Sequence, residues 1–337
     1  MEREIFAQVR THWDKLNPGT PRPNDFVLLK VQGKQSRKGC MVALVLDAKR
    51  RTPVVVVKVP RNPAYTRHVE TEAVGLASVH GRGLGSESLR HVPWGTLLTA
   101  LGGQTALLQS ACRGYPMTRI LDRREEIEDR YGEILEWMRE FHSVGRTAVT
   151  LEGADLDAWV ETPLREVEQK LPRLYEALAK RTKDYLSSLG SRVYGKTAAL
   201  TRQHGDFNAH NLLLQEQSPR FFLVDWEDFS PCELPIHDLN HFFVSNSKVL
   251  GEGGDAQSTF RNALLTEGWY QDLYRDAVRQ QSHRGVIEED LFWQLTPLYF
   301  LRMCLRVTDE ARDEGHTADV WARRADAFIA DFPELRQ

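Results

Sequence analysis

The feature that most constrains the fold of this chain is a pair of polar clusters joined by a predicted β-hairpin. The first cluster, HGDFNAHN, spans residues 204–211, and the second, VDWE, spans residues 224–227. The segment 212–223 holds two apolar runs separated by a polar stretch, which predicts two antiparallel strands joined by a turn. At the open end of such a hairpin, the residue that opens the outgoing strand and the residue that closes the returning strand lie roughly 5 Å apart. We therefore expect Asn211 and Asp225 to face one point.

The residues expected at this point have the chemistry of a magnesium site. The side-chain amide oxygen of Asn211 and the carboxylate of Asp225 suit Mg²⁺, which keeps few protein ligands and takes the others from phosphate and water. Asp206 precedes Asn211 by five residues and would be placed to receive a proton from an attacking hydroxyl group. This set of groups is the equipment needed to move a phosphoryl group from Mg-ATP to a hydroxyl. We interpret His204 and His210 as residues that support the loop through hydrogen bonds.

A lysine in an apolar strand forms the second constraint. Residues 53–60, PVVVVKVP, predict a strand bounded by two prolines, and strand alternation puts Lys58 on an otherwise apolar face. A buried ammonium needs an anionic partner. The segment 66–79 reads as a helix, in which Glu72 is a better-placed partner than Glu70, and ATP phosphates would serve as well. From this segment alone, an alternative remains open: Lys58 would prevent an edge strand from pairing with another chain, and Glu72 would be a solvated charge on the helix.

Together these residues resemble the aminoglycoside phosphotransferase and choline kinase-like family, whose members are small-molecule kinases built on the protein-kinase fold. The resemblance runs from about residue 26 to residue 243. Residues 204–211 resemble the catalytic loop of the family, Asp225 its metal-binding aspartate and Lys58 its nucleotide-binding lysine. Asp238, in the sequence PIHDL, resembles the aspartate that supports the catalytic loop. The resemblance implies an α+β, two-lobed protein-kinase-like fold, with a small antiparallel-sheet N-lobe and a mainly helical C-lobe.

Two further segments carry the resemblance into the nucleotide site. Residues 107–114, LLQSACRG, look like the hinge between the lobes, where the backbone carbonyl of Ser110 and the backbone N–H of Cys112 would bond the adenine edge. The loop expected over the phosphates is GKQSRKG, residues 33–39, and it departs from the glycine-rich pattern G-x-G-x-x-G. Ser36 and neighbouring N–H groups could hold a phosphate there, and a plain hairpin turn is the open alternative.

Composition agrees with this reading. A chain of 337 residues, 41% hydrophobic and 27% charged, can bury a full core in two lobes. A net charge of −3 supplies no basic field for nucleic acid. The N-terminus lacks the apolar core of a signal peptide and no run is long enough to span a membrane, so we expect a cytoplasmic protein. The cysteines show no C-x-x-C spacing and indicate neither a zinc site nor a disulfide framework: Cys40, Cys112, Cys232 and Cys304.

The positions of the motifs predict three parts. Residues 1–22 form an N-terminal helical extension, residues 23–112 the nucleotide-binding N-lobe, and residues 113–337 the C-lobe with the catalytic loop and the acceptor site. One face of the N-terminal helix is apolar: Ile5, Val9, Trp13 and Leu16. In the C-lobe, helices are expected at about 127–141, 155–188, 257–280, 288–313 and 318–331.

The expected activity is the ATP- and Mg²⁺-dependent transfer of a phosphoryl group to a hydroxyl of a small molecule, with GTP as the alternative donor. The acidic stretch 152–161, together with Glu227 and Asp228, would favour a cationic acceptor, unless it is only a solvated face. An aminoglycoside, a sugar and an amino alcohol all remain open. The sequence does not indicate an oligomeric state.

Two other classes of protein are alternatives to a small-molecule kinase. A catalytically silent nucleotide-binding scaffold would normally have lost one of the key residues, yet all are present: Lys58, Asp206, Asn211 and Asp225. A protein kinase has a long activation segment ending near an A-P-E element, which forms the platform for a peptide. Here twelve residues separate Asp225 from Asp238 and no A-P-E element occurs. The sequence therefore favours a small-molecule acceptor.

Overall fold

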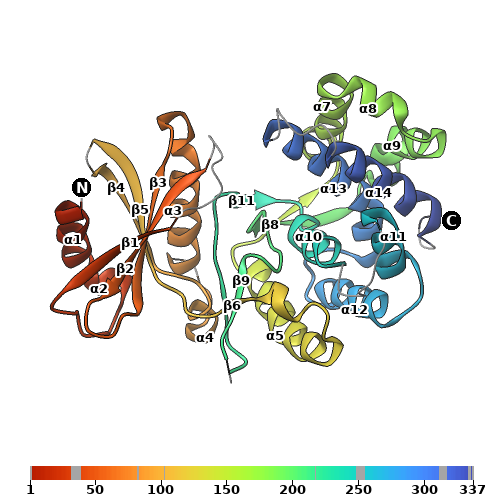
Figure 1. Ribbon diagram of the computed structural model, residues 1–337. Helices are drawn as coiled ribbons and strands as arrows, with labels where there is room; N and C mark the ends of the chain where they lie inside the picture. The colour runs from red at the N-terminus through yellow and green to blue at the C-terminus, as the bar shows by residue number, and fades with distance from the viewer. Residues whose placement is uncertain are drawn as a thin grey trace. The chain divides into compact units, whose positions relative to one another are not determined.

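The computed structural model describes residues 2–31, 39–81, 83–101, 103–216, 218–247, 255–310, 317–332 and 335. It divides into two compact units (Figure 1). Unit 1 contains residues Met1–Arg119 and His204–Pro231, and unit 2 contains Ile120–Gln203 and Cys232–Gln337.

A five-stranded antiparallel sheet forms the centre of unit 1. Its strand order is β1-β2-β3-β5-β4. The apolar, β-branched composition of these segments favours strands, and prolines stand at both ends of the third. The strands are β1 (Phe26–Val31), β2 (Cys40–Asp47), β3 (Pro53–Pro60), β4 (Gly95–Leu101) and β5 (Gln104–Ser110).

Helices cover both faces of this sheet. Helices α1 (Glu2–Thr11) and α2 (Trp13–Leu16) pack on one face, where the alternate residues Val55, Val57 and Val59 are buried. The helix α3 (Thr66–Gly81) lies on the other face, as Figure 1 shows. The predicted alternation of β3 is therefore confirmed. The four apolar residues predicted for one face of the N-terminal helix are all buried: Ile5, Val9, Trp13 and Leu16.

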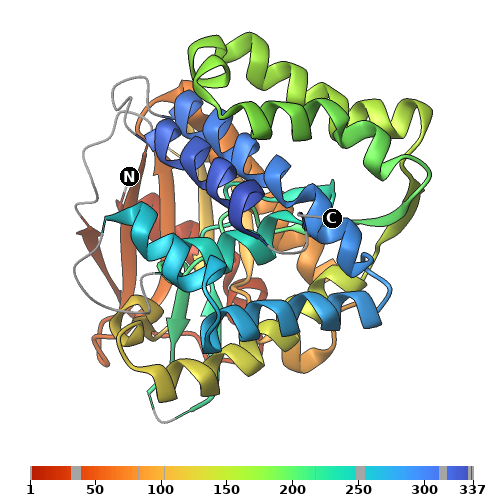
Figure 2. The same ribbon diagram turned by 90° about the vertical axis from the view of Figure 1, so that its right-hand side faces the viewer.

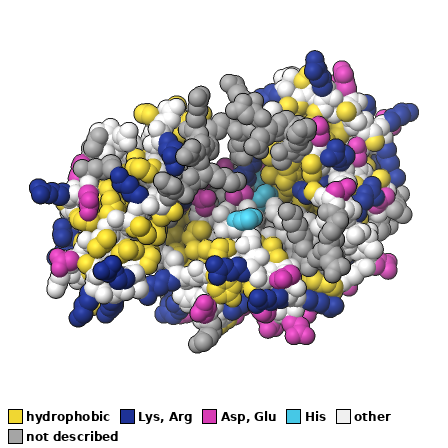
Figure 3. All heavy atoms as spheres, viewed as in Figure 1, with side chains coloured by type: hydrophobic (Ala, Val, Ile, Leu, Met, Phe, Trp, Pro, Cys, Tyr) yellow, Lys and Arg dark blue, Asp and Glu magenta, His cyan; other side chains and the backbone are white. Residues whose placement is uncertain are grey.

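The face that carries α3 is not covered along its whole width. Val27, Leu29 and Val31 of the edge strand β1 are 41%, 51% and 38% exposed. Hydrophobic side chains also gather at the surface over β1 and β2 in Figure 3. Because these residues alternate with the more buried Phe26 and Leu28, they share the face of the sheet on which Lys58 stands.

The predicted hairpin is present in unit 1. Strands β9 (Leu212–Leu214) and β10 (Phe221–Leu223) are antiparallel, with Leu212 opposite Leu223, and β6 (Tyr115–Pro116) extends their sheet. A Cβ on Gly114 would lie 2.6 Å from the carbonyl oxygen of Leu214, so a glycine permits this close approach. Short helical segments complete the unit: η1 (Pro63–Tyr65), α4 (Ser86–Leu89) and η2 (Met117–Ile120), which ends at its boundary.

Unit 2 is mainly helical, and a small sheet has the order β11-β8-β7, in which β7 and β8 belong to unit 2 and β11 contains the boundary between Pro231 and Cys232. The strands are β7 (Thr147–Thr150), β8 (Thr197–Gln203) and β11 (Ser230–Glu233). Helices α13 and α14 run side by side, as the blue ribbons of Figure 2 show. The long helices are α5 (Arg124–Ser143), α9 (Lys180–Val193), α10 (His237–Ser245), α12 (Trp269–His283), α13 (Glu289–Glu310) and α14 (Thr317–Asp331). Within the described residues, no helix is both long and apolar enough to cross a membrane.

Two of the helices expected from the sequence are broken into several pieces. The expected helix 155–188 is interrupted at Leu171, because Pro172 cannot continue the hydrogen-bond ladder and disfavours helical geometry in the residue before it. The expected helix 257–280 is interrupted at Thr266 and begins again after Gly268. The pieces are α6 (Gly153–Leu156), η3 (Asp157–Glu161), α7 (Thr162–Lys170), α8 (Pro172–Ala177) and α9 in the first case, and α11 (Ala256–Phe260), η5 (Arg261–Leu265) and α12 in the second.

Candidate active site

The second residue of the loop 204–211 is a glycine that no other residue could replace without strain. Gly205 has a φ of +87°, in the left-handed region. A Cβ at this position would lie 2.1 Å from the backbone oxygen of Asp228. The loop and the segment that follows Asp225 are therefore in direct contact within unit 1.

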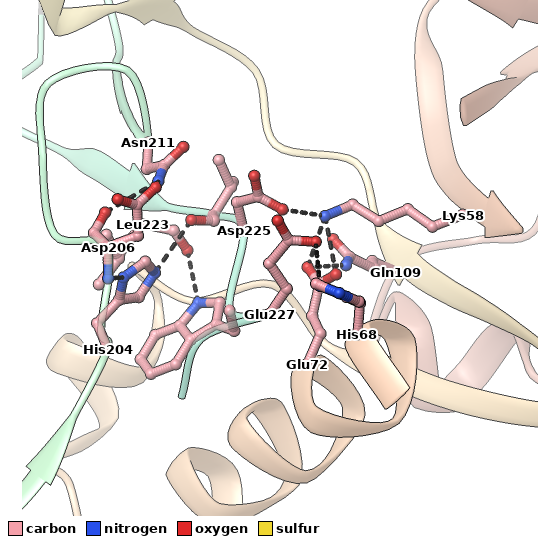
Figure 4. Close-up of polar contacts among 12 residues, drawn as sticks. Lys58, His68, Glu72, Gln109, His204, Asp206, Asn211, Leu223, Asp225 and Glu227 are labelled. Carbon is pink, nitrogen blue, oxygen red and sulfur yellow. Dashed lines mark hydrogen bonds and ion pairs between the residues drawn. The ribbon is translucent and has the colours of Figure 1, made fainter. Parts of the chain in front are cut away.

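Asp206 and Asn211 are joined across the loop, as Figure 4 shows. The side-chain Nδ2 of Asn211 donates to the carboxylate Oδ2 of Asp206 at 2.7 Å and to the backbone oxygen of Asp206 at 2.9 Å. Asn208 also donates to that backbone oxygen, at 3.2 Å. Because the Asn211 nitrogen is engaged by Asp206, the amide oxygen of Asn211 points away from that residue.

His204 supports the loop, as the sequence predicts. Its Nδ1 accepts the backbone N–H of Asp206 at 3.2 Å, and its Nε2 lies 3.1 Å from the carbonyl oxygen of Val224. An Nδ1 that accepts a hydrogen bond carries no proton, so the ring is neutral and donates through Nε2. The ring also packs edge-on against buried Trp226. His210 is exposed, and its backbone N–H donates to the side chain of Asn208 at 2.9 Å.

The hairpin brings Asn211 and Asp225 to the same end. The backbone N–H of Val224 donates to the carbonyl of Asn211 at 2.9 Å, which continues the ladder beyond β9 and β10. Asp225 follows with a φ of +67°, an uncommon conformation for a residue other than glycine. Among the described residues, no group of three or more His, Cys, Asp or Glu side chains could hold a metal ion. A metal at this position would need the Asn211 amide and ligands from outside the protein.

Lys58 joins two carboxylates. Its Nζ lies 2.8 Å from both side-chain oxygens of Glu72 on α3 and 2.6 Å from Oδ1 of Asp225 (Figure 4). The pairing of Lys58 with Glu72 is the contact that the sequence predicts. The Lys58 side chain is 14% exposed and that of Glu72 1%, whereas that of Asp225 is 39% exposed. The accessible end of this cluster is therefore the Asp225 carboxylate.

The charges in the cluster shift one another's pKa values. Burial alone would lower the pKa of Lys58, but the charges of Glu72 and Asp225 and their hydrogen bonds raise it above its ordinary value. Burial raises the pKa of Glu72, and the charge of Lys58 opposes that rise. An ammonium so placed remains charged, and a buried carboxylate is tolerated because it is paired.

Glu227 adds a further acidic group close to this cluster. Burial, followed by the negative charge of Asp225, raises the pKa of Glu227 to about 8. Its Oε2 lies 3.5 Å from Nδ1 of His68, in the first turn of α3. Burial and the neighbouring negative charges thus favour the protonated form of the Glu227 carboxyl group.

The segment expected to form the hinge follows directly after β5. The backbone N–H of Ser110 donates to the carbonyl of Trp94 at 2.8 Å, and the side chain of Ser110 accepts the Trp94 N–H at 2.8 Å. The N–H of Ala111 donates to the carbonyl of Val54 at 3.1 Å. Burial raises the pKa of the Cys112 thiol to about 12, so this group stays protonated. Ser36, predicted as a phosphate contact, lies outside the described residues.

Two residues of the site were not predicted from the sequence, one in contact with the cluster and one in contact with Glu227. Gln109 donates to Oε1 of Glu72, and His68 lies near Glu227. The signal for Gln109 was strand periodicity, since it shares a face of the sheet with Lys58 once the pairing of β3 with β5 is known.

Asp238 lies in unit 2, where it contacts the strand that leads into the loop. It is fully buried, and its backbone N–H donates at 2.9 Å to the side chain of Gln203, the last residue of β8. Its carboxylate lies 3.3 Å from Nε2 of the buried His142. The structure thus connects Asp238 to the residue directly before His204.

Comparison with known proteins places this geometry in a family. The model of the phosphotransferase enzyme family matches residues 42–270, which cover every described residue of the cluster. The chain belongs to the phosphotransferase enzyme family. This phosphotransferase finds no match among the curated proteins searched.

Solved structures share the fold of this phosphotransferase at low sequence identity. A proposed aminoglycoside phosphotransferase from Ralstonia eutropha JMP134 is 14% identical, with 98% of each chain covered and a TM-score of 0.59. A thermostable mutant of the aminoglycoside phosphotransferase APH(4)-Ia, in a ternary complex with ADP and hygromycin B, is 12% identical, with 99% of each chain covered and a TM-score of 0.55. These similarities establish the mixed α+β, protein-kinase-like fold.

Proposed function

We propose that this phosphotransferase transfers the γ-phosphoryl group of ATP to a hydroxyl group of a small molecule, with Mg²⁺ as cofactor. The observation that carries the proposal is that a single unit holds two linked polar groupings. One is the Asp206–Asn211 pair, and the other is the cluster of Lys58, Glu72 and Asp225. The backbone hydrogen bond from the N–H of Val224 to the carbonyl of Asn211 connects the two groupings.

The chemistry of the donors fits Mg²⁺. The amide oxygen of Asn211 and the carboxylate of Asp225 are hard oxygen ligands, and the exposed part of Asp225 leaves room for phosphate and water. Asn211 and Asp225 would hold the ion, which would supply positive charge to stabilise the charge that develops on the phosphate oxygens. The hydrogen bond from Asn211 to Asp206 fixes which atom of the amide is left for the metal.

Lys58 would hold the phosphates of the nucleotide. Its pairing with Glu72 keeps the ammonium in place, and its raised pKa keeps it charged. In the described contacts it also donates to Asp225, so the ammonium and the metal-binding carboxylate are adjacent. The raised pKa and the ion pair together support a role in orienting phosphate oxygens.

Asp206 would orient the acceptor hydroxyl and receive its proton. Its carboxylate is half-buried, and one oxygen is held by Asn211. Phosphoryl transfer requires little covalent chemistry from the protein, so alignment of the hydroxyl with the γ-phosphorus would supply most of the rate.

The adenine would lie against the hinge, with the Ser110 carbonyl and the Cys112 N–H as its partners. The backbone hydrogen bond from the N–H of Ala111 to the carbonyl of Val54 holds this segment along the sheet and supports this position for the adenine. Related solved structures contain ADP, AMP-PNP or GDP. We propose ATP as the donor, GTP as the second candidate, and the cytoplasm, where these nucleotides are abundant, as the location.

The acceptor is proposed to be small. Between Asp225 and Asp238 the chain forms β11, with a short turn before it and another after it, and α10 begins at His237. This leaves no long activation segment, unlike a protein kinase. The acidic stretch 152–161 is a weaker guide than its charge suggests, because Asp157 and Glu161 both pair with Arg165, at 2.7 and 3.6 Å.

A panel of hydroxylated compounds tests the proposal. Purified protein with Mg-ATP is incubated with aminoglycosides, sugars and amino alcohols, ADP release is measured, and the product is identified by mass spectrometry. We expect acceptor-dependent ADP release and one phosphoryl group on the compound. Mg-ATP binding without turnover across the panel would favour a silent scaffold. Stoichiometric phosphorylation of a protein, without response to any small molecule, would favour a protein kinase.

A further inference from the structure

A buried glutamine on β5 contacts the same carboxylate as Lys58. Gln109 is 3% exposed, and its Nε2 donates to Oε1 of Glu72, a residue that is 1% exposed (Figure 4). Lys58 donates to both oxygens of that carboxylate at 2.8 Å. Oε1 of Glu72 therefore receives an ammonium and an amide donor at the same time.

The sheet explains why the amide and the ammonium share a face. Gln109 stands opposite Val56 in the ladder between β3 and β5, and Lys58 stands opposite Leu107. Residues two apart on a strand lie on the same face. Diagonal neighbours of an antiparallel pair lie about 7–8 Å apart, a gap that one carboxylate can bridge.

A glycine allows α3 to bring its carboxylate there. Gly95 of β4 stands opposite Gln109 on the other side of β5. A Cβ on Gly95 would lie 2.5 Å from Cδ1 of Leu76, so the Leu76 side chain occupies the space that the glycine leaves. Glu72 lies one turn before Leu76 on the same side of α3. The packing of Leu76 on Gly95 thus sets Glu72 beside Gln109.

We propose that Gln109 is a positioning residue, which holds the Glu72 carboxylate so that both of its oxygens meet Lys58. Its importance for nucleotide binding rests on the proposed function, in which Lys58 holds the phosphates. Lys58 also lies 2.6 Å from Asp225, so two carboxylates compete for one ammonium. The amide gives Glu72 a second donor without adding charge, and so leaves the ammonium free to serve both acids.

The electrostatics agree with this geometry. Burial raises the pKa of Glu72, while the hydrogen bond from Gln109 acts in the opposite direction and favours the ionised carboxylate. Loss of the amide would leave the carboxylate with Lys58 as its remaining donor among the contacts found here. The carboxylate would then be freer to rotate and easier to protonate.

Three variants separate positioning from packing. Gln109→Met keeps the length of the side chain and removes the donor. Gln109→Glu introduces a carboxyl group that can donate to Glu72 only when it is protonated. Leu108→Met is the matched control, because Leu108 is the adjacent buried residue of β5, faces the N-terminal helices, and the exchange conserves volume.

The first measurement needs no nucleotide. The rate at which an amine-reactive reagent labels Lys58 is followed by peptide mapping. A hydrogen bond to a charged group corresponds to roughly a 10-fold or larger factor, so labelling in Gln109→Met should rise by about that factor over wild type and Leu108→Met. Gln109→Glu should approach the wild-type rate as pH falls, because its protonated carboxyl group can then donate to Glu72. Equal labelling in all proteins would overturn the proposal.

The second measurement is the dissociation constant for Mg-ATP, together with the thermal midpoint. Gln109→Met should bind Mg-ATP about 10-fold more weakly, with the thermal midpoint of Leu108→Met. Weaker binding that follows a lowered midpoint in both variants would count against positioning. If wild type bound no Mg-ATP while Lys58 labelling still rose in Gln109→Met, the proposed function would fall and the placement of Gln109 would stand.

Discussion

Asn211 donates its side-chain N–H to the carboxylate of Asp206 at 2.7 Å, so the positions of the two side chains depend on each other. The residue proposed to hold the metal also fixes the residue proposed to receive the proton. A substitution of Asn211 is therefore expected to disturb both steps, whereas substitutions of Asp225 and Lys58 can separate metal binding from phosphate binding.

We expect Asp225→Ala to weaken the dependence of nucleotide binding on metal, because it removes the carboxylate that we propose as a direct ligand. Even outer-shell changes commonly cost 10- to 100-fold in metal affinity, so loss of the ligand should cost roughly that or more. Lys58→Ala should lower turnover with a smaller effect on metal affinity, since we propose that its ammonium contacts phosphate oxygens and not the metal. Titration of Mg²⁺ against nucleotide binding measures the metal dependence of both variants, and a steady-state assay measures their turnover. An unchanged metal dependence in Asp225→Ala would rule out the ligand assignment.

Gly205→Ala should impair both stability and turnover. A left-handed conformation costs an alanine about 1–2 kcal/mol, and here the new Cβ would also meet the backbone oxygen of Asp228 at 2.1 Å. Gly195→Ala is the control, because Gly195 has a φ of +74° and nothing within 4 Å of its Cβ position. Denaturant unfolding should show the smaller loss in Gly195→Ala, with turnover retained. Equal losses in the two variants would contradict the proposed contact.

The stability of the protein should fall on acidification partly through His80. Burial lowers the pKa of His80 below its ordinary value of 6.5, and its ring stacks on Trp94. The unfolded chain then binds the proton more readily than the folded one. The contribution of His80 is present above pH 6.5 and is lost as pH falls through the lowered pKa.

The variant His80→Phe keeps an aromatic ring against Trp94 and cannot titrate. Its free energy of unfolding, measured from about pH 8 to about pH 5, should fall less steeply than that of wild type. It also loses the hydrogen bond to the carbonyl of Pro93, which lowers stability equally at each pH above the transition. Parallel curves for the two proteins would show that His80 does not contribute to the acid sensitivity.

Sequence periodicity was sufficient for the local parts of the site. The alternation of β3 predicted the face on which Lys58 stands, and the two apolar runs predicted β9 and β10. Both depend on neighbours along one strand or across one turn. The likeness to small-molecule kinases predicted the mixed α+β fold, which the family match and the solved structures confirm. The lobe limits at 22 and 112 remain a proposal.

The parts that sequence did not predict depend on distant packing. The contact of Gln109 with Glu72 requires α3 to approach the sheet at Gly95, and no local pattern encodes that approach. At Leu171 the error was of another kind. The apolar periodicity predicted a continuous helix, although Pro172 restricts the conformation of Leu171 and interrupts the helix there. Local patterns thus place side chains on faces, while the choice of partners follows from the packing of whole elements.

The central claim is that Asp206 acts on the acceptor and that the nucleotide is held by other residues. Single-turnover phosphoryl transfer by Asp206→Asn tests it most directly, since the asparagine oxygen can still accept the hydrogen bond from Asn211. We predict that the rate falls roughly 100- to 10,000-fold while the dissociation constant for Mg-ATP stays nearly unchanged. A variant that kept more than about a tenth of the wild-type rate would contradict the account.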